Sequence, residues 1–277
     1  MKRLLQIEFQ KLKHSRSARV LSIIYFALFT LIALFASIRF KFGGIDFQLA
    51  DQGIFNFPYI WHFNTYFAAF LKIFLAIVIV SMMSNEYSNR TLKQNLIDGL
   101  SKKEFILSKF YTVVVFSLVS TLFIFIVSLI LGIIFSDYDE LSIIFSDLEY
   151  LLAYFIKLIG FFSFCMFLGI FVKKSAFALG FLFVWWIFEN LLYGLIRWEI
   201  GNEEVARNIT QFFPLESISN LVKQPISKLN VIQSTANQLN TDLQFDSNVY
   251  FYQILIVLVW IFIFVWGSYA LLKRRDL

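Results

Sequence analysis

Side chains able to do catalytic or metal chemistry are few and scattered in this sequence. Of 277 residues, one is cysteine, Cys165, and two are histidine, His14 and His62. A single cysteine cannot form an internal disulfide, and there is no Cys-x-x-Cys pair or His/Cys cluster with the spacing of a zinc or haem site. No Gly-x-x-x-x-Gly-Lys-Ser/Thr loop is present to hold nucleotide phosphates. We therefore expect no metal, no cofactor and no nucleotide bound by this chain.

One acidic motif suggests an alternative enzymatic function. Glu203-Glu204 followed by Arg207 is one residue short of the Glu-Glu-x-x-x-Arg signature of glutamate-type intramembrane proteases. The motif falls outside the apolar segments, which favours a solvated, charged helix face. The protease stays an alternative, and the chain is not expected to be an enzyme.

Three ionisable residues stand inside otherwise apolar segments: Lys72, Lys157 and Glu189. At a helical rise of about 1.5 Å per residue, Glu189 and Lys157 lie at similar depth, each roughly 10 Å from the same end of their segments. An unpaired charge in lipid is costly. We therefore expect Glu189 to face other helices and pair with Lys157 or Lys72, either as a gate or pathway contact or as a structural ion pair.

The elements that carry these charges are predicted to be membrane-spanning helices. The composition is 59% hydrophobic and 16% charged, with 36 Phe, too apolar for a soluble protein of this size. About 20 apolar residues cross a ~30 Å hydrocarbon core. The predicted fold is an all-α polytopic bundle, one domain over residues 1–277, and six segments are long enough: Val20–Ile38, Trp61–Met83, Phe110–Phe135, Tyr150–Val172, Ser175–Ile196 and Val249–Leu272.

Lys and Arg placement predicts the orientation. Residues 1–19, 84–109, 173–174 and 273–277 hold 16 Lys/Arg in 52 positions, whereas the segments on the opposite side hold 6 in 88. Cytoplasmic loops carry the excess of positive charge. Both termini are therefore expected in the cytoplasm of a multi-pass plasma (inner) membrane protein.

The amino terminus is predicted to be an amphipathic helix. Leu5, Phe9 and Leu12 recur on one helical face, and basic side chains surround them. Such a helix is typical of one lying on the inner leaflet, with its cations facing anionic lipid. The alternative is a solvated basic tail that only orients the first span.

The external segment Arg197–Asn248 is long enough to hold structure of its own. Apolar side chains around Pro214 predict short re-entrant or interfacial helices. The polar half, Ser227–Asn248, has little to bury and is expected to be a loop.

The segment 84–109 is expected to present a small cytoplasmic helix. Asn89–Ile97 can form a helix that Asp98-Gly99 ends, because Gly tolerates the left-handed cap conformation. Ser101 and Glu104 form a capping box before the third span. Leu92, Leu96 and Ile97 give the small helix an apolar edge suited to a groove on a partner, flanked by Arg90 and Lys93.

The arrangement of this segment resembles the type-2 ATP-binding-cassette (ABC) exporter permease family. That resemblance covers the topology of essentially the whole chain. Two departures are Arg90 where Gly is usual and Gly99-Leu100 where Pro is common. The matching positions are Glu86, Thr91, Ser101-Lys102, Phe105 and Lys109.

The resemblance implies a permease subunit that forms the substrate pathway of an exporter. It implies two partners: a cytoplasmic ABC ATPase subunit, which uses ATP, and a second permease subunit in a homo- or heterodimer. Membrane lipid surrounds the chain, and no nucleic acid is expected. Glu86 would transmit movement of the docked helix to the second span. A non-transporting scaffold or assembly factor remains an alternative, and the residues expected to couple to the ATPase are Glu86, Arg90, Thr91, Leu92, Lys93, Leu96 and Ile97.

Overall fold

The computed structural model describes residues 2–42, 45–48, 50–225 and 247–275. They form a helical bundle in which six helices are long and apolar enough to cross a membrane, as predicted. Most ends of the long helices lie at or beyond the predicted segments, because polar side chains continue the helix past its apolar stretch. The exceptions are α2, which ends one residue before Ile38, and α12, which begins two residues after Val249. They are α2 (Arg16–Ser37), α3 (Tyr59–Ser88), α5 (Lys102–Phe135), α7 (Glu149–Val172), α8 (Ser175–Ile200) and α12 (Phe251–Arg274).

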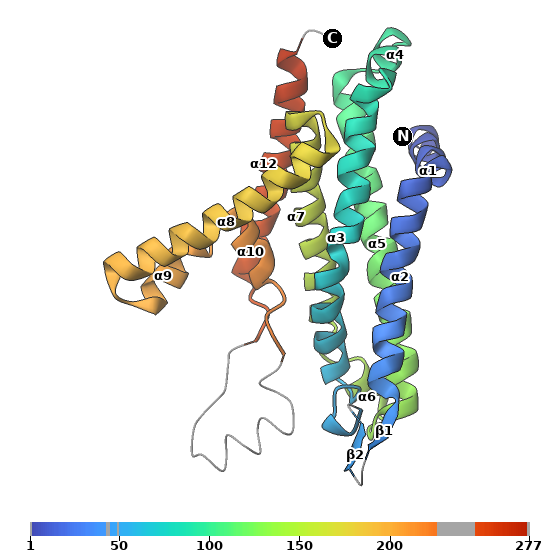
Figure 1. Cartoon of the computed structure of the whole chain (residues 1–277), viewed down its shortest axis with the longest axis vertical. Helices are drawn as coiled ribbons and strands as arrows, with labels where there is room; N and C mark the ends of the chain where they lie inside the picture. The colour runs from blue at the N-terminus through green and yellow to red at the C-terminus, as the bar shows by residue number, and fades with distance from the viewer. Residues whose placement is uncertain (1, 43–44, 49, 226–246, 276–277) are drawn as a thin grey trace.

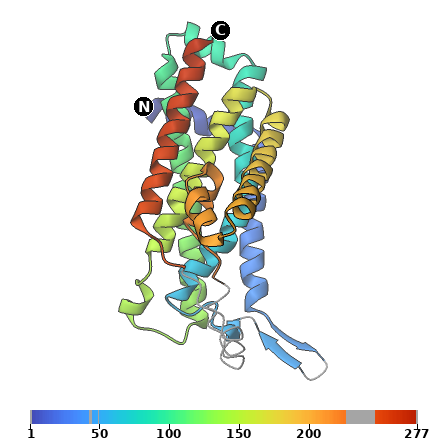
Figure 2. The ribbon, with the colours of Figure 1, turned by 90° about the vertical axis from the view of Figure 1, so that its left-hand side faces the viewer.

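Shorter elements occupy the connections between these helices. An antiparallel hairpin follows α2 and pairs Arg39 with Gln48. It projects beyond the end of the bundle opposite the termini (Figure 2). The short elements are α1 (Lys2–His14), β1 (Arg39–Phe42), β2 (Ile45–Gln48), η1 (Ala50–Gln52), α4 (Thr91–Ile97), α6 (Leu141–Ile144), α9 (Glu203–Thr210) and α10 (Pro214–Asn220).

Helix α7 is the centre of the bundle. The span that contains α7 runs from Leu141 to Val172, and 72% of its most apolar stretch is buried inside the protein. The corresponding value for α8 is 11%. Helix α7 packs against α3, α5, α8 and α12. Two glycines allow close approach: a Cβ at Gly160 would lie 2.9 Å from Val257 of α12, and one at Gly169 would lie 2.7 Å from Met83 of α3. The hydrophobic core therefore follows α7 along its length.

Helix α8 leans away from the other helices, and α9 folds back beside its far end (Figure 1). Large apolar side chains cover its outward faces, among them Phe177, Trp186 and Trp198, which is 84% exposed. In a membrane this surface meets lipid or another protein.

Both ends of the chain lie at the same end of the bundle as α4 (Figure 1). This arrangement agrees with the charge-based grouping of the termini with the segment 84–109. The local signals predicted there are present. Gly99 adopts a φ of +95° just after α4, and Ser101 and Glu104 form the complete capping box of α5.

Candidate functional site

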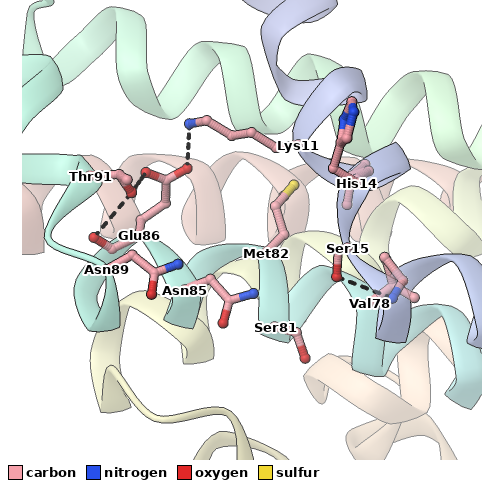
Figure 3. Close-up of a pocket in the computed structure, with 12 residues that line it drawn as sticks. Lys11, His14, Ser15, Val78, Ser81, Met82, Asn85, Glu86, Asn89 and Thr91 are labelled. Atoms are coloured by element: carbon pink, nitrogen blue, oxygen red, sulfur yellow. Dashed lines mark hydrogen bonds and ion pairs between the residues drawn. The ribbon is translucent and has the colours of Figure 1, made fainter.

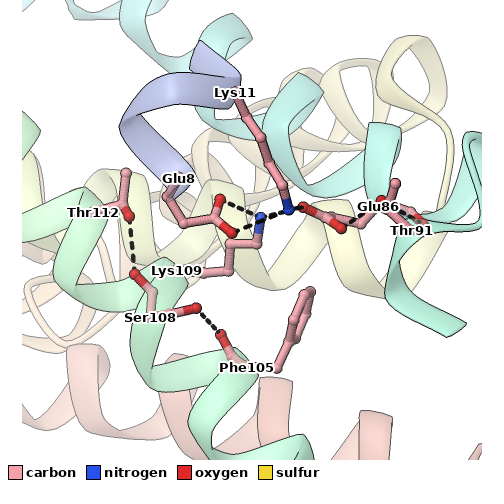
Figure 4. A network of polar contacts seen from close by, with 8 residues as sticks. All are labelled: Glu8, Lys11, Glu86, Thr91, Phe105, Ser108, Lys109 and Thr112. Carbon is pink, nitrogen blue, oxygen red and sulfur yellow. Dashed lines mark hydrogen bonds and ion pairs between the residues drawn. The ribbon is translucent and has the colours of Figure 1, made fainter. Parts of the chain in front are cut away.

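Four buried or partly buried charged side chains from three helices meet at this end of the bundle (Figure 4). Lys109 of α5 donates to Glu86 of α3 and to Glu8 of α1, both at 2.5 Å. Lys11 of α1 lies 2.8 Å from Glu86 and 3.3 Å from Glu8. Two carboxylates and two ammonium groups thus alternate in a cluster that joins α1, α3 and α5. We call these four residues the charge cluster.

The charge cluster also contacts the small helix α4. Thr91, the first residue of α4, donates its hydroxyl to Glu86 at 2.6 Å. The preceding residue, Arg90, takes a left-handed conformation with φ 56°, which lets α3 end and α4 begin in a new direction. The carboxylate of Glu86 therefore binds residues of α4, α1 and α5 at the same time.

The charges of the cluster are buried or partly buried, so each one depends on its oppositely charged partners. Lys109 is fully buried, and Glu8 and Glu86 are 5% and 3% exposed. Removing one member of a buried ion pair leaves an uncompensated charge and typically costs ~3–5 kcal/mol. Because the cluster holds two charges of each sign, loss of any single member leaves it with a net charge.

Lys11 sits at the edge of the cluster. Burial alone would lower the pKa of its ammonium, but the hydrogen bond and charge of Glu86, together with Glu8, outweigh burial and raise that pKa above its usual value. A raised pKa means that the charged form is favoured in the folded protein. Its contribution is complete below the ordinary pKa of a lysine and is lost only as the pH rises through the raised value.

Glu8 and Lys11 were not predicted as site residues. Glu86 and Lys109 were recognised from the family-like pattern, but the helix at the amino terminus was interpreted from its apolar face and its surrounding cations. The available signal was Glu8 itself, the one acid among the basic residues of α1. An acid at that position with a lysine three residues later predicts an ion pair within α1, but not the helix that this face contacts.

The small helix α4 does not expose the predicted apolar edge in full. Leu92 is 1% exposed and belongs to the protein's own core, so the prediction that it enters a partner's groove is wrong. Leu96 is partly buried against the same core. The helix is anchored by Leu92 because its first turn lies against α3. Ile97, at 69% exposed, and the exposed Arg90 and Lys93 remain on the open surface.

The carboxyl-terminal tail is tied to the same end of the bundle. The guanidinium of Arg275 donates to the backbone carbonyls of Ile170 at 2.6 Å and Phe171 at 3.0 Å, near the end of α7. Lys102 of α5 donates to the Arg275 carbonyl at 3.0 Å. The tail therefore links α12 to the ends of α5 and α7.

Glu189 does not pair with Lys157 or Lys72, so that prediction is wrong. Its carboxylate instead accepts hydrogen bonds from the backbone N–H groups of Leu215 at 3.1 Å and Glu216 at 3.0 Å. These belong to the first turn of α10, whose N-cap residue Phe213 has no side-chain acceptor. Trp185 also donates to Glu189, at 2.6 Å. The carboxylate thus caps a helix and compensates its positive end.

Lys157 binds the opposite end of α10. Its ammonium donates to the carbonyls of Ser219 at 2.9 Å and Val222 at 3.1 Å. The predicted pairing of Glu189 with Lys157 failed because the short helix expected around Pro214, which is α10, lies between the two charges. The two charges interact with the two ends of α10 rather than with each other.

Within the described part of the chain, Lys72 bonds to neither end of α10, unlike Glu189 and Lys157. Its ammonium lies 4.5 Å from the ring centroid of Phe161 in a cation–π contact. Among the residues that the structure describes, no carboxylate lies within ion-pair distance of Lys72. Inserting a lysine near the middle of a span costs roughly 2.5–3.5 kcal/mol on insertion scales. One cation–π contact stabilises the charge by less than this.

The acidic motif considered as a protease signature lies on the surface. Glu203 forms ion pairs with Arg207 at 2.5 Å and with Arg197 at 2.8 Å, and all three side chains are well exposed. This is the solvated, charged helix face that the sequence favoured.

The polar half of the external segment, Ser227–Asn248, lies almost entirely outside the described residues.

Comparison with known protein families finds a match to this chain. A family model described as "ABC-2 family transporter protein" matches residues 4–189. The matched range contains all four members of the charge cluster, α4, and the three charged residues of the spans. No curated protein matches the chain.

Proposed function

Because a family model covers more than half of its length, the chain belongs to the ABC-2 transporter family, and we propose that it is the permease subunit of an ABC exporter coupled to a separate ATPase. It is a multi-pass membrane protein with six apolar helices. In this proposal a cytoplasmic ABC ATPase subunit binds and hydrolyses ATP. A second permease subunit, identical or different, completes the pathway in the plasma membrane.

The charge cluster is the observation that carries this proposal. A helix that receives force from a partner must be joined rigidly to the spans it moves. Thr91 at the start of α4 is bound to Glu86, and Glu86 is bound to Lys109 of α5 and Lys11 of α1. Movement of α4 would therefore reach three helices through one buried carboxylate.

The surface of α4 that remains open is suited to an acidic, partly apolar groove. Ile97 supplies an exposed apolar side chain, and Arg90 and Lys93 supply exposed cations beside it. Burial of such a side chain contributes about 1.5–3 kcal/mol to binding. That contribution is roughly ten- to hundredfold in affinity.

The first prediction concerns ATPase binding. Ile97→Asp should reduce copurification of the ATPase at least tenfold, because it replaces the exposed apolar contact with a charge of the wrong sign. Membrane insertion and yield should not change, since Ile97 contacts little of its own chain. The measurement is the ATPase-to-permease ratio after affinity purification from membranes.

The control for Ile97→Asp is Asn208→Asp, which adds the same charge at an exposed position of α9. It should keep the ATPase at the wild-type ratio. If Ile97→Asp also keeps it, α4 is a turn between spans and does not dock a partner. If no ATPase accompanies even the wild-type protein, the scaffold alternative gains support.

The second prediction concerns topology. We expect α4 and both termini in the cytoplasm and α9 outside, from the excess of Lys and Arg at one end. Single cysteines at Ile97 and Asn208, both exposed, should react oppositely with an impermeant maleimide applied to intact cells: Asn208→Cys labelled, Ile97→Cys protected until the cells are opened. The native Cys165 is buried and adds little background. Labelling of Ile97→Cys in intact cells would invert the proposed orientation.

A further inference from the structure

An open cleft of ≈400 Å³ lies between the junction of α1 with α2 and the end of α3 that carries Glu86 (Figure 3). One wall comes from α3 and the start of α4, the other from the last turn of α1 and the first turn of α2. Its volume falls in the range of sites that hold small organic molecules. The lining residues are Lys11, Leu12, His14, Ser15, Ala18, Val78, Ser81, Met82, Asn85, Glu86, Asn89 and Thr91.

The wall contributed by α3 changes from apolar to polar along its length. Val78, Met82, Asn85 and Asn89 recur at helical spacing, so they form one stripe on α3. Val78 and Met82 lie toward the middle of the span, and the two asparagines lie toward its end. The stripe extends over 12 residues, from 78 to 89, or roughly 16 Å at helical rise. A molecule that matches this wall must itself be apolar at one end and polar at the other.

The polar end offers hydrogen-bond donors from two side-chain amides. The side-chain amides of Asn85 and Asn89 are exposed in the cleft, and His14 lies on the facing wall. The carboxylate of Glu86 is already engaged by Lys11 and Thr91. Exposed cations of the same corner, Lys13, Arg16 and Arg19, add positive charge around the opening.

We propose that this cleft binds one anionic phospholipid of the adjacent leaflet. The phosphate accepts from Asn85 and Asn89 within the positive field of the α1–α2 corner, and an acyl chain passes the partly exposed Leu12 on the facing wall. A free phosphate would use only the polar end and leave the apolar half unexplained. The bound lipid would touch Glu86 and Thr91, and so would contact the start of α4. This inference goes beyond the proposed function and does not depend on it.

The test is photocrosslinking in lipid nanodiscs with the full-length protein and any partners that copurify. The probe is phosphatidylglycerol with a photoreactive acyl chain, compared with phosphatidylcholine carrying the same chain. We expect phosphatidylglycerol adducts concentrated on residues 78–89 and 11–18, at least fivefold above the phosphatidylcholine signal there. Asn85→Asp/Asn89→Asp should reduce these adducts at least fivefold, because the isosteric carboxylates repel the phosphate.

The matched control is Ser88→Asp, which places the same charge on an exposed part of α3 outside the cleft. It should leave the adducts unchanged. Glycerol 3-phosphate in solution should not compete, since it lacks the apolar half. Adducts spread evenly over all lipid-facing helices, equal labelling by both lipids, or insensitivity to the two asparagine substitutions would each overturn the proposal.

Discussion

Replacing Lys109 with methionine should destabilise the protein by roughly 3–5 kcal/mol, the cost of leaving a buried charge without its partner. Lys109 is fully buried and bonds to both Glu8 and Glu86. Methionine fills a similar volume but cannot compensate either carboxylate, and Lys11 alone would face both. The measurement is the unfolding of the purified protein in detergent, followed by tryptophan fluorescence.

Two further variants show whether the loss of charge or the change in side-chain volume causes the loss of stability in Lys109→Met. Lys103→Met makes the same substitution at an exposed position of α5 and should change stability little. Glu8→Gln combined with Lys109→Met leaves one carboxylate and one ammonium, so the double variant should recover much of the loss. A double variant as unstable as Lys109→Met would mean that packing, rather than charge balance, holds this end of the bundle together.

Glu189→Gln should release α10 from its position between the spans. The substitution removes the negative charge that accepts from the Leu215 and Glu216 amides, and hydrogen bonds to charged groups contribute ~1.5–3 kcal/mol. Local opening should rise by roughly ten- to a hundredfold or more. The readout is the maleimide labelling rate of Ile218→Cys, a fully buried position on α10.

Glu199→Gln, an exposed change on the same helix α8, should leave that labelling rate unaltered. Lys157→Met should also raise the rate, because Lys157 binds the opposite end of α10. The two effects should be non-additive although the side chains do not touch, since either substitution frees the same helix. Unchanged labelling in both variants would show that packing alone, and not the two charges, positions α10.

The sequence contains most of the information on the fold because lipid imposes a simple rule. A helix is the open-chain structure that satisfies its own backbone within hydrocarbon, so each apolar run of sufficient length predicts a span. The caps around α4 were also predictable, because Gly99, Ser101 and Glu104 act through neighbours in the chain. Helix ends were less certain, since α5 begins eight residues before its charge-free stretch.

The partners of the charges were not predictable in the same way. Glu8 and Lys109 are 101 positions apart, and nothing local indicates that α1 turns its acid toward α5. For Glu189 and Lys157, depth along a helix did not predict the partner, because rotation about the axis and the position of α10 decided their contacts. Leu92 shows the same limit, because its spacing on α4 cannot distinguish a face turned to the core from one turned to a partner.

The central position of α7 has a consequence for how the protein is made. Helices α2, α3 and α5 enter the membrane before α7 is synthesised. Both α3 and α5 pack against α7, and α2 contacts it through a buried tyrosine. Tyr25 of α2, for example, is completely buried and pairs with Tyr154 of α7 at 2.7 Å. During translation these surfaces face lipid or the insertion machinery until about residue 172 has emerged. Assembly of the bundle is therefore a late event in the life of the nascent chain, and a ribosome stalled before that point would hold three inserted helices that have not yet acquired their common neighbour.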